Sequence, residues 1–578
     1  MMVMDQLRRT LAWLMLGLAI GAVLALAGCG GGGTTTNSAT GSGGGTSTGA
    51  DANHGALTLG LTGGGLHGVD HVWVQVYKVA LHADADQVWS SSDASWTVLS
   101  LSTPVAVDLA AVKTSDNSFV AALFSGLKVP AGTYRQLRLF VLPHEGTLSD
   151  VATATGLSYN AQVNYTSGGS AYVVPLELPQ VDQGWRVTGS FVVAGNQYPY
   201  WALHTDLQDS LQRIAGSDGL THFLMRPRLQ RFDMAKGVAI FGQVDAAAVC
   251  GNASAPAAPD CADEISVSAQ VLSSDGLRHE AVRRYKVDST GGFALYPLPE
   301  ASSYDLVITG KHMRTMVVKG VAVEAFDVTS GLGWTVVGDG SAIPLSIESG
   351  TPASVSLSSS ASPQASSLYW GQTPDASGLP YEVMSTTLNP LDGLPASDVV
   401  LPQGSMMVAT FQRATSTISG VIEGEALTFQ SVPPVEGNGA FGLVTLGTAY
   451  DDASATSVLT PPSGSSSVQA PVASRRTGVL NGTLTVTLTG SLSSRYDAVQ
   501  VIVSDVNGVV DARSYATSPG SVSFSVPAGT VAAAAQGGAV YSVAVRASSM
   551  SGNLTWVRGS SVVNLRATTT GSVTLALP

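Results

Sequence analysis

Three side chains that follow one predicted strand could together bind a divalent cation. His82, Asp84 and Asp86 stand two residues apart, directly after the apolar segment 72–81. Imidazole nitrogen and carboxylate oxygen are both ligands that divalent metals accept in proteins. Polar residues also collect where strands end in surface loops, so the same spacing fits a solvated loop. Beyond this candidate set the sequence predicts no metal site and no cofactor.

Linear motifs of hydrolases and nucleotide-binding enzymes are missing from the positions where they would work. The chain has no Gly-x-Ser-x-Gly elbow between a predicted strand and a helix, no His-Glu-x-x-His, no Ser-x-x-Lys at a predicted helix start and no Walker loop. Two Gly-x-Gly-x-x-Gly matches, at 63–68 and 437–442, precede strand patterns, whereas a dinucleotide site needs a helix N-terminus there. We therefore predict no catalytic residues and interpret these glycines as turn residues.

The first thirty residues predict export. Arg8 and Arg9 precede an uncharged apolar run from Leu11 to Ala27. The end of this run forms the sequence Leu26-Ala27-Gly28-Cys29 together with the next two residues. This is the order of a signal peptide, and a retained transmembrane helix is the alternative. The four residues that end in Cys29 resemble the lipobox of bacterial lipoproteins. The resemblance implies cleavage before Cys29 and attachment of diacylglycerol and a fatty acyl chain such as palmitate to that cysteine.

The same resemblance implies where the protein works. Several acyl chains give durable membrane attachment, so the membrane is the predicted partner of the N-terminus. Gly30 stands where an Asp would retain such a lipoprotein at the inner membrane. The predicted location is therefore the cell envelope, with the lipid in the outer membrane and the chain on its periplasmic or surface face.

Composition narrows the class of function. The 578 residues carry a net charge of −13 and no basic cluster, so we predict no nucleic-acid partner. Besides Cys29, the chain has only Cys250 and Cys261, separated by the ten-residue loop 251–260. In an oxidising compartment two such cysteines are expected to form a disulfide, and two free thiols are the alternative. A zinc site would need further Cys or His ligands close by.

From residue 56 onward the chain alternates apolar and polar residues with the period of β-strands. The apolar face changes from even to odd positions near Tyr77-Lys78, which predicts a β-bulge. The segments LTLGLT, VWVQVYKVALH, VAVDLAAV and PAGTYRQLRLFV resemble, in order, the strands of domain of unknown function 4382. That resemblance implies a β domain and no particular activity. Gly63-Gly64-Gly65 departs from the short turn of that family.

The rest of the chain predicts further β-sandwiches in tandem, so the fold class is all-β. The stretch VDSTGGFALYPLP followed by YDLVITG resembles the carboxypeptidase regulatory-like, transthyretin-like sandwich, which is non-catalytic. One helix is predicted at 205–216. We predict this order of parts: signal peptide (1–28), lipidated cysteine and Gly/Ser/Thr tether (29–55), 4382-like domain (56–235), carboxypeptidase regulatory-like sandwich (236–360), third β unit (365–455), linker (456–476) and immunoglobulin- or fibronectin-like sandwich (477–578).

Two classes of function fit this organisation. The first is a non-enzymatic envelope protein that presents or recognises a polysaccharide or a partner protein. The second is an envelope enzyme that acts on glycans through carboxylates, which carry no linear signature. Several aromatic side chains could stack on sugars but are more typical of sandwich cores: Trp89, Trp96, Trp185, Tyr200, Trp201, Tyr369 and Trp370.

Overall fold

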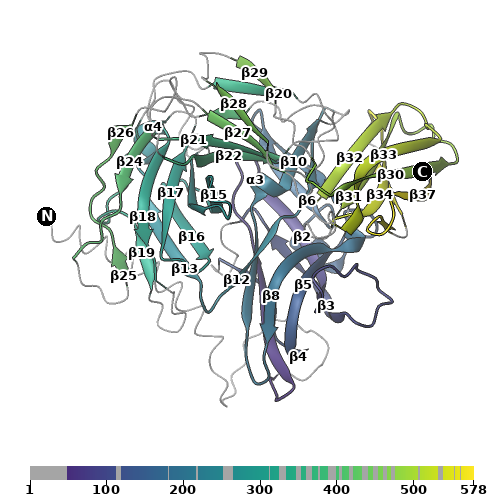
Figure 1. The fold of residues 1–578 in the computed structure, drawn as a ribbon, viewed down its shortest axis with the longest axis horizontal. Coiled ribbons are helices and arrows are strands. Elements are labelled where there is room, and N and C mark those ends of the chain that lie inside the picture. Colours follow the sequence, from purple (N-terminus) through teal and green to yellow (C-terminus); the bar gives the residue numbers. More distant parts are fainter. Residues whose placement is uncertain are drawn as a thin grey trace.

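The computed structural model is built almost entirely of β-strands, which make up 58% of the chain against 5% helix. This confirms the predicted all-β class with several packed sheets (Figure 1). The structure describes residues 49–578 apart from 112–118, 180, 216–218, 251–264, 311–312, 325–332, 347–352, 359–366, 375–377, 388–398, 402–405, 416–420, 433–440, 447–452, 460–464, 470–474, 506–507, 531–537, 552–553 and 560–561.

The N-terminal unit consists of two packed sheets. One has the order β12-β9-β1-β4, and the other has the order β10-β11-β7-β6-β2-β5-β8 with β3 paired to β2. The bounds are β1 (His54–Thr62), β2 (His71–His82), β3 (Thr97–Asp108), β4 (Ala121–Pro130), β5 (Gly132–Val141), β6 (Gln162–Ser167), β7 (Ser170–Glu177), β8 (Trp185–Val193), β9 (Tyr200–Thr205), β10 (Leu211–Ala215), β11 (Thr221–Met225) and β12 (Leu229–Asp233).

The central unit recruits strands from two separate stretches of the chain. Its sheets have the orders β16-β13-β19-β25 and β15-β14-β17-β18-β24-β26. Its strands are β13 (Val238–Gln243), β14 (Ser266–Leu272), β15 (His279–Lys286), β16 (Gly292–Leu298), β17 (Ser303–Thr309), β18 (Met316–Ala322), β19 (Trp334–Val336), β24 (Met406–Thr410), β25 (Val421–Glu423) and β26 (Gln430–Val432).

The inserted unit is interleaved with the central one. It has a sheet β23-β20-β29 and a sheet β22-β21-β27-β28. Its strands are β20 (Ala353–Ser358), β21 (Ser367–Gln372), β22 (Tyr381–Thr387), β23 (Val399–Leu401), β27 (Phe441–Leu446), β28 (Ala453–Leu459) and β29 (Ser465–Gln469). The stretch 365–455 supplies most of the sheet β22-β21-β27-β28, but its strands β24, β25 and β26 pair with strands of the central unit.

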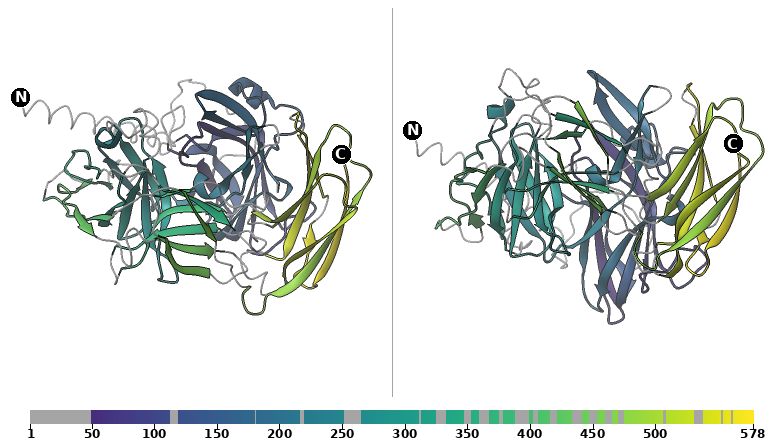
Figure 2. Two further views of the ribbon diagram at one scale, coloured as in Figure 1. Left: turned by 90° about the horizontal axis from the view of Figure 1, so that it is seen from above. Right: turned by 45° about the horizontal axis from the view of Figure 1, so that its top comes forward.

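The C-terminal unit has the two facing sheets of a sandwich. Strand order is β33-β30-β37 in one sheet and β32-β31-β34-β35, with β36 paired to β34, in the other. The strands are β30 (Leu480–Thr489), β31 (Ala498–Asp505), β32 (Gly508–Tyr515), β33 (Ser521–Ala528), β34 (Val540–Ser548), β35 (Leu554–Arg558), β36 (Val563–Asn564) and β37 (Thr570–Ala576). Figures 1 and 2 place the N-terminal unit between this sandwich and the central unit.

Helices are few and short: α2 (Asp150–Thr155), the 3-10 turn η2 (Val181–Gln183), α3 (Leu207–Ser210) and α4 (Ala246–Cys250). The predicted helix at 205–216 is wrong beyond α3, since residues 211–215 pair antiparallel with β11 as strand β10. Tertiary pairing has overridden the local helical pattern there. Among the described helices none is long and apolar enough to cross a bilayer.

The strand patterning of the N-terminal unit is confirmed in detail. The register of β2 shifts between Val76 and Lys78 against both β3 and β5, which is the predicted bulge. Six of the seven singled-out aromatics are buried, from Trp370 at 0% to Trp89 at 8% exposure. They fill cores, as sandwich aromatics usually do, and so cannot form an exposed row for sugar stacking.

Candidate functional site

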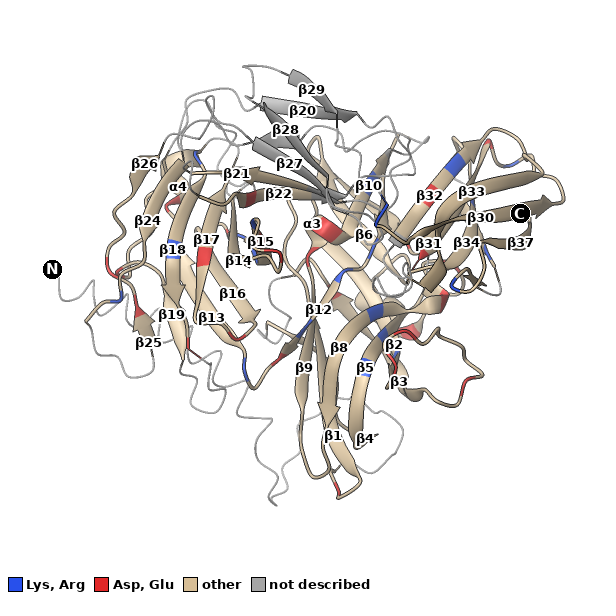
Figure 3. Ribbon diagram, viewed as in Figure 1, with Lys and Arg blue, Asp and Glu red and all other residues tan. Residues whose placement is uncertain are grey.

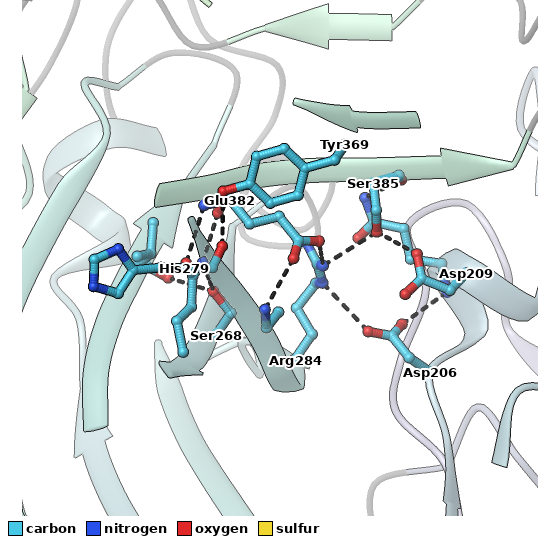
Figure 4. Close-up of polar contacts among 12 residues, drawn as sticks. Asp206, Asp209, Ser268, His279, Arg284, Tyr369, Glu382 and Ser385 are labelled. Carbon is cyan, nitrogen blue, oxygen red and sulfur yellow. Dashed lines mark hydrogen bonds and ion pairs between the residues drawn. The ribbon is translucent and has the colours of Figure 1, made fainter. Parts of the chain in front are cut away.

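A cluster of polar contacts lies where three units meet (Figure 4). Arg284 of β15 binds the Glu382 carboxylate of β22 and donates to Ser385 Oγ at 3.3 Å. Its Nε lies 3.4 Å from Asp206 Oδ2, just before α3. Ser385 in turn donates to the Asp209 carboxylate. One guanidinium therefore connects the N-terminal, central and inserted units.

Glu382 is held on every side by groups of the central unit. Its Oε2 accepts the backbone N–H of Ala281 at 2.9 Å. Its own backbone N–H donates to Gln270 Oε1, and its carbonyl accepts from Gln270 Nε2 at 2.6 Å. Gln270 of β14 thus binds the main chain of Glu382, and the carboxylate of Glu382 binds Ala281 and Arg284. The cluster is thus a saturated interface, in which Glu382 is committed to protein partners.

Burial in this cluster favours a proton on Asp206. Burial raises the pKa of Asp206 to about 6; Arg284 opposes the shift, and Asp209 and Glu382 add to it. All three carboxylates act on Arg284, and the buried Arg283 and Arg226 also interact electrostatically with Asp206 and Asp209. A carboxylate pair is the arrangement expected of a glycan hydrolase. Here, however, the carboxylates hold strands of three units together.

A second buried contact joins the N-terminal and central units. Arg283 of β15 is 2% exposed, and its Nη1 lies 3.1 Å from His204 Nδ1 on β9. Its Nη2 donates to Thr62 Oγ1 and to the Gly63 carbonyl, both at 3.3 Å. Because a guanidinium only donates, His204 must be neutral and accept at Nδ1. Burial, with repulsion from Arg283, holds the pKa of His204 well below 6.5.

This contact predicts a pH dependence of stability. Below pH 6.5 the unfolded chain protonates His204 while the native chain does not, so native stability falls as the pH falls through that value. We expect His204→Asn, whose amide oxygen can accept from Arg283, to remove this loss. Between pH 7.5 and 5 the wild type should lose roughly 2 kcal/mol more than the variant in urea titrations. Parallel pH profiles for the two proteins would contradict a neutral buried His204.

The C-terminal sandwich is fastened to the N-terminal unit by charge and by apolar contact. Arg546 of β34 forms a two-pronged ion pair with Glu177 of β7, at 2.7 and 2.9 Å. Arg558 of β35 binds Glu145 at 2.8 Å. Around them lies one buried apolar cluster with members from both units: Ile214, Leu224, Ile502, Val509, Ala544 and Trp556. This combination is typical of a fixed interface rather than of loosely tethered domains.

Strand β5, the last segment of the family resemblance, supplies buried polar groups to this side of the N-terminal unit. Gln136 donates to the carbonyls of Ala85 and Gln87, both at 3.0 Å, and so fixes the loop after β2. Arg138, 2% exposed, donates from Nε to Gln136 Oε1 at 2.6 Å. Figure 3 shows basic positions along β5 and β8. A cleft between the two units is lined there by arginines.

The candidate metal ligands have other partners. His82 Nδ1 accepts the backbone N–H of Asp84 at 2.9 Å, and its Nε2 lies 2.9 Å from Ser95 Oγ. Asp84 accepts the backbone N–H of Asp86, whose carboxylate pairs with Arg186 at 3.4 Å. Within the described ranges no three His, Cys, Asp or Glu side chains group as a metal site. The three residues shape the loop that Gln136 holds.

The cysteine predictions fall largely outside the described residues. Cys29, with the signal peptide and most of the tether, lies in 1–48, and Cys261 lies in 251–264. Cys250 ends α4. Lipidation of Cys29 and the Cys250–Cys261 disulfide therefore stay predictions.

Of the first Gly-x-Gly-x-x-Gly match, Gly68 lies in a turn, as interpreted, and the glycines before it lie in the connection from β1 to β2, where they have a packing role. A Cβ added at Gly63 would meet the Leu109 carbonyl oxygen at 2.0 Å. One added at Gly64 would lie 3.0 Å from the carbonyl oxygen of Arg284 in the central unit. Strand β2 follows, so no helix is present to receive a phosphate. The departure from the family turn thus lets this loop approach the neighbouring unit closely.

Sequence inspection missed the arginines that matter most here. Arg138, Arg283, Arg284 and Arg546 all lie inside strands, where alternation alone assigns one face to solvent. The sequence did contain two signals. The adjacent arginines in β15 place a charge on both faces of that strand, and the Gln-x-Arg pair in β5 places polar side chains beside an apolar run. Such positions indicate interfaces only when the partner strand is known.

Together, the paired sheets and buried junctions define a multi-sandwich all-β protein. Residues 54–227 match the family described as Domain of unknown function (DUF4382), so the N-terminal unit contains a DUF4382 domain. No curated protein matches the chain. The resemblance of 236–360 to the carboxypeptidase regulatory-like sandwich stays a prediction.

Solved structures give only distant likenesses. The Bacillus anthracis TIE protein is 7% identical over 88% of this chain and 68% of its own, with a TM-score of 0.14. The C-terminal fragment of the pilus adhesin SpaC from Lactobacillus rhamnosus GG is 11% identical over 39% of this chain and 97% of its own, with a TM-score of 0.10. The open conformation of SpaC is 9% identical, covers 88% of this chain and 56% of its own, and has a TM-score of 0.11. At these scores no conclusion about function follows.

Proposed function

We propose that this chain is a lipid-anchored protein of the cell envelope that works without catalysis, as a rigid set of β-sandwiches which presents or recognises a partner outside the cytoplasm. The proposal that the protein is not catalytic is supported by one observation: its buried charged side chains pair with each other between units. Arg284 with Glu382, and Arg546 with Glu177, join separate units. Buried ion pairs of this kind fix the arrangement of the units, because separating the two partners would leave each charge without its counter-ion in a desolvated place.

The anchor rests on the sequence around Cys29. A lipidated cysteine would leave the Gly/Ser/Thr tether between membrane and N-terminal unit, with a reach of about 5–6 Å × √n for n residues. Such a tether holds a rigid body near the bilayer while allowing it to reorient. A polysaccharide or another envelope protein is the class of partner that such a body would meet at the periplasmic or surface face of the outer membrane.

The anchor is tested by intact mass of the protein purified from membranes, as wild type, Cys29→Ala and Cys250→Ala. We expect the wild type to begin at Cys29 and to carry diacylglycerol and acyl mass. Cys29→Ala should lose that mass and leave the membrane fraction, whereas Cys250→Ala, which also removes one cysteine, should keep both. An unmodified wild-type chain, or one that retains residues 1–28, would refute the anchor.

Catalysis is tested on the same material. The purified protein is incubated with envelope polysaccharide, and bound sugar and new reducing ends are both measured. Binding without new reducing ends is expected of a recognition protein. If reducing ends accumulate with wild type and disappear with Glu382→Gln or Asp209→Asn, the protein is instead a carboxylate glycan hydrolase.

A further inference from the structure

A narrow cleft between the DUF4382 domain and the C-terminal sandwich, with room for about one water molecule, brings three guanidinium groups together. Arg138 and Arg186 line it from β5 and β8, and Arg566 lines it from the segment after β36. Asp86 and Asp505 complete its charged lining. Three positive charges therefore face two negative ones, in a chain whose net charge is −13. The local excess of positive charge is thus not a consequence of overall composition.

Two of these arginines make their hydrogen bonds only to uncharged acceptors. Arg138 donates from Nε to Gln136 Oε1 at 2.6 Å and from Nη1 to the Gln183 carbonyl at 2.7 Å. Arg566 donates from Nη1 to the Asp86 carbonyl at 2.6 Å. Among the described residues, Arg138 Nη2 has no hydrogen-bond partner, and Arg566 Nε is buried without one. Donors thus remain for a further acceptor.

The carboxylates of the cleft act mainly on the third arginine. Asp86 Oδ1 lies 3.4 Å from Arg186 Nη2, and Asp505 also favours the charged form of Arg186. Burial, with repulsion from Arg186 and Arg566, lowers the pKa of Arg138 to about 9. A buried guanidinium that lacks a carboxylate partner is costly. An anion placed beside Arg138 and Arg566 would relieve both the desolvation and the mutual repulsion.

We propose that this cleft is a binding site for one oxyanion group, a carboxylate, sulfate or phosphate, held by Arg138 and Arg566. The guanidinium fork matches the paired oxygens of these groups, which is why arginine is common at sites for carboxylate and phosphate. The group has two possible sources, a free inorganic ion or an acidic substituent of an envelope sugar. The second source rests on the proposed function, whereas the first is independent of it.

Because its walls come from two units, an occupied cleft should stabilise their docking. A ligand that binds only the docked state adds RT ln(1 + [L]/Kd) to stability. Occupancy is therefore measurable as a saturable rise in the unfolding temperature. Trp556 is 7% exposed within the same interface and reports its opening by fluorescence.

The experiment uses the mature protein in detergent, titrated with sodium sulfate, sodium phosphate or sodium glucuronate at constant ionic strength in chloride. We expect saturable stabilisation that chloride does not reproduce. Arg566→Gln and Arg138→Gln should each weaken binding at least tenfold. Arg413→Gln, at an exposed ion pair with Glu324 in the central unit, should leave it unchanged.

The outcomes separate the sources of the ligand. Saturation by all three salts assigns a free oxyanion, and saturation by glucuronate alone assigns an acidic sugar. No saturation, or equal binding by wild type and Arg566→Gln, overturns the site. Arg566 is partly exposed, so its variant tests the site even if Arg138→Gln fails to fold. A failed lipid analysis at Cys29 would leave this result untouched.

Discussion

Replacing Arg546 by methionine is expected to cost about 3–5 kcal/mol of interface stability, because it leaves a charged Glu177 buried without its partner. Glu177 is 0% exposed at the end of β7, and both of its oxygens accept from Arg546, at 2.7 and 2.9 Å. Urea titration followed by the fluorescence of Trp556 should show this interface opening at much lower urea than in the wild type.

The matched control for that variant is Arg513→Met on β32. Its ion pair with Asp511 spans 3.7 Å and its side chain is 42% exposed, so its removal should cost at most about 1 kcal/mol. The double variant Glu177→Met with Arg546→Met should recover most of the loss, since apolar groups often replace a buried pair without cost. Equal effects of Arg546→Met and Arg513→Met would show that the buried pair does not fasten the sandwich.

Replacing Arg284 by methionine is expected to be about as costly, roughly 3–5 kcal/mol, by the same reasoning at the three-unit junction. Burial alone would lower the pKa of Arg284, but Glu382, Asp206 and Asp209 raise it above its ordinary value. Without the guanidinium these three carboxylates repel each other in a desolvated place. The measurement is the urea midpoint of the variant at pH 7.5.

The Arg284→Met variant should also become less unstable in acid. Carboxylates that lose their cation bind protons more tightly in the native than in the unfolded state, so their penalty falls as the pH drops below their native pKa. We expect its deficit against the wild type to shrink from pH 7.5 to pH 5. Lys236→Met is the control, because its pair with Glu300 is 64% exposed on both sides. A pH-independent deficit would mean that these carboxylates do not bind protons more tightly once Arg284 is lost.

These junctions also explain which parts of the site were predictable. The candidate ligands His82, Asp84 and Asp86 stand two residues apart in the chain, and in the structure they belong to a loop held by local hydrogen bonds, with no metal-type grouping among the described residues. The arginine cleft draws on residues about 480 positions apart, as the bond from Arg566 to Asp86 shows. The spacing of residues along the sequence cannot predict that two residues so far apart come into contact.

The helix predicted at 205–216 shows the same limit at the level of the fold. Its apolar spacing is compatible with a helix, but residues 211–215 gain a partner in β11, and β11 runs beside β7. Likewise, the chain returns from the inserted unit to add β24 to β18 of the central unit. Neither strand pairing follows from the conformational preference of the local sequence, because pairing depends on which other strands lie beside it in the fold.

By itself, then, the sequence determined the local conformation of most segments: strands by their period of two, the bulge at Val76–Lys78 by a change of face, and turns by glycine. These follow from the geometry of neighbouring residues, which is the same in any fold. The tertiary structure alone decided which strands share a sheet and which buried charges meet. Those outcomes depend on desolvation and on partners distant in the chain, and in this protein they form the three-unit junction, the Glu177–Arg546 interface and the arginine cleft.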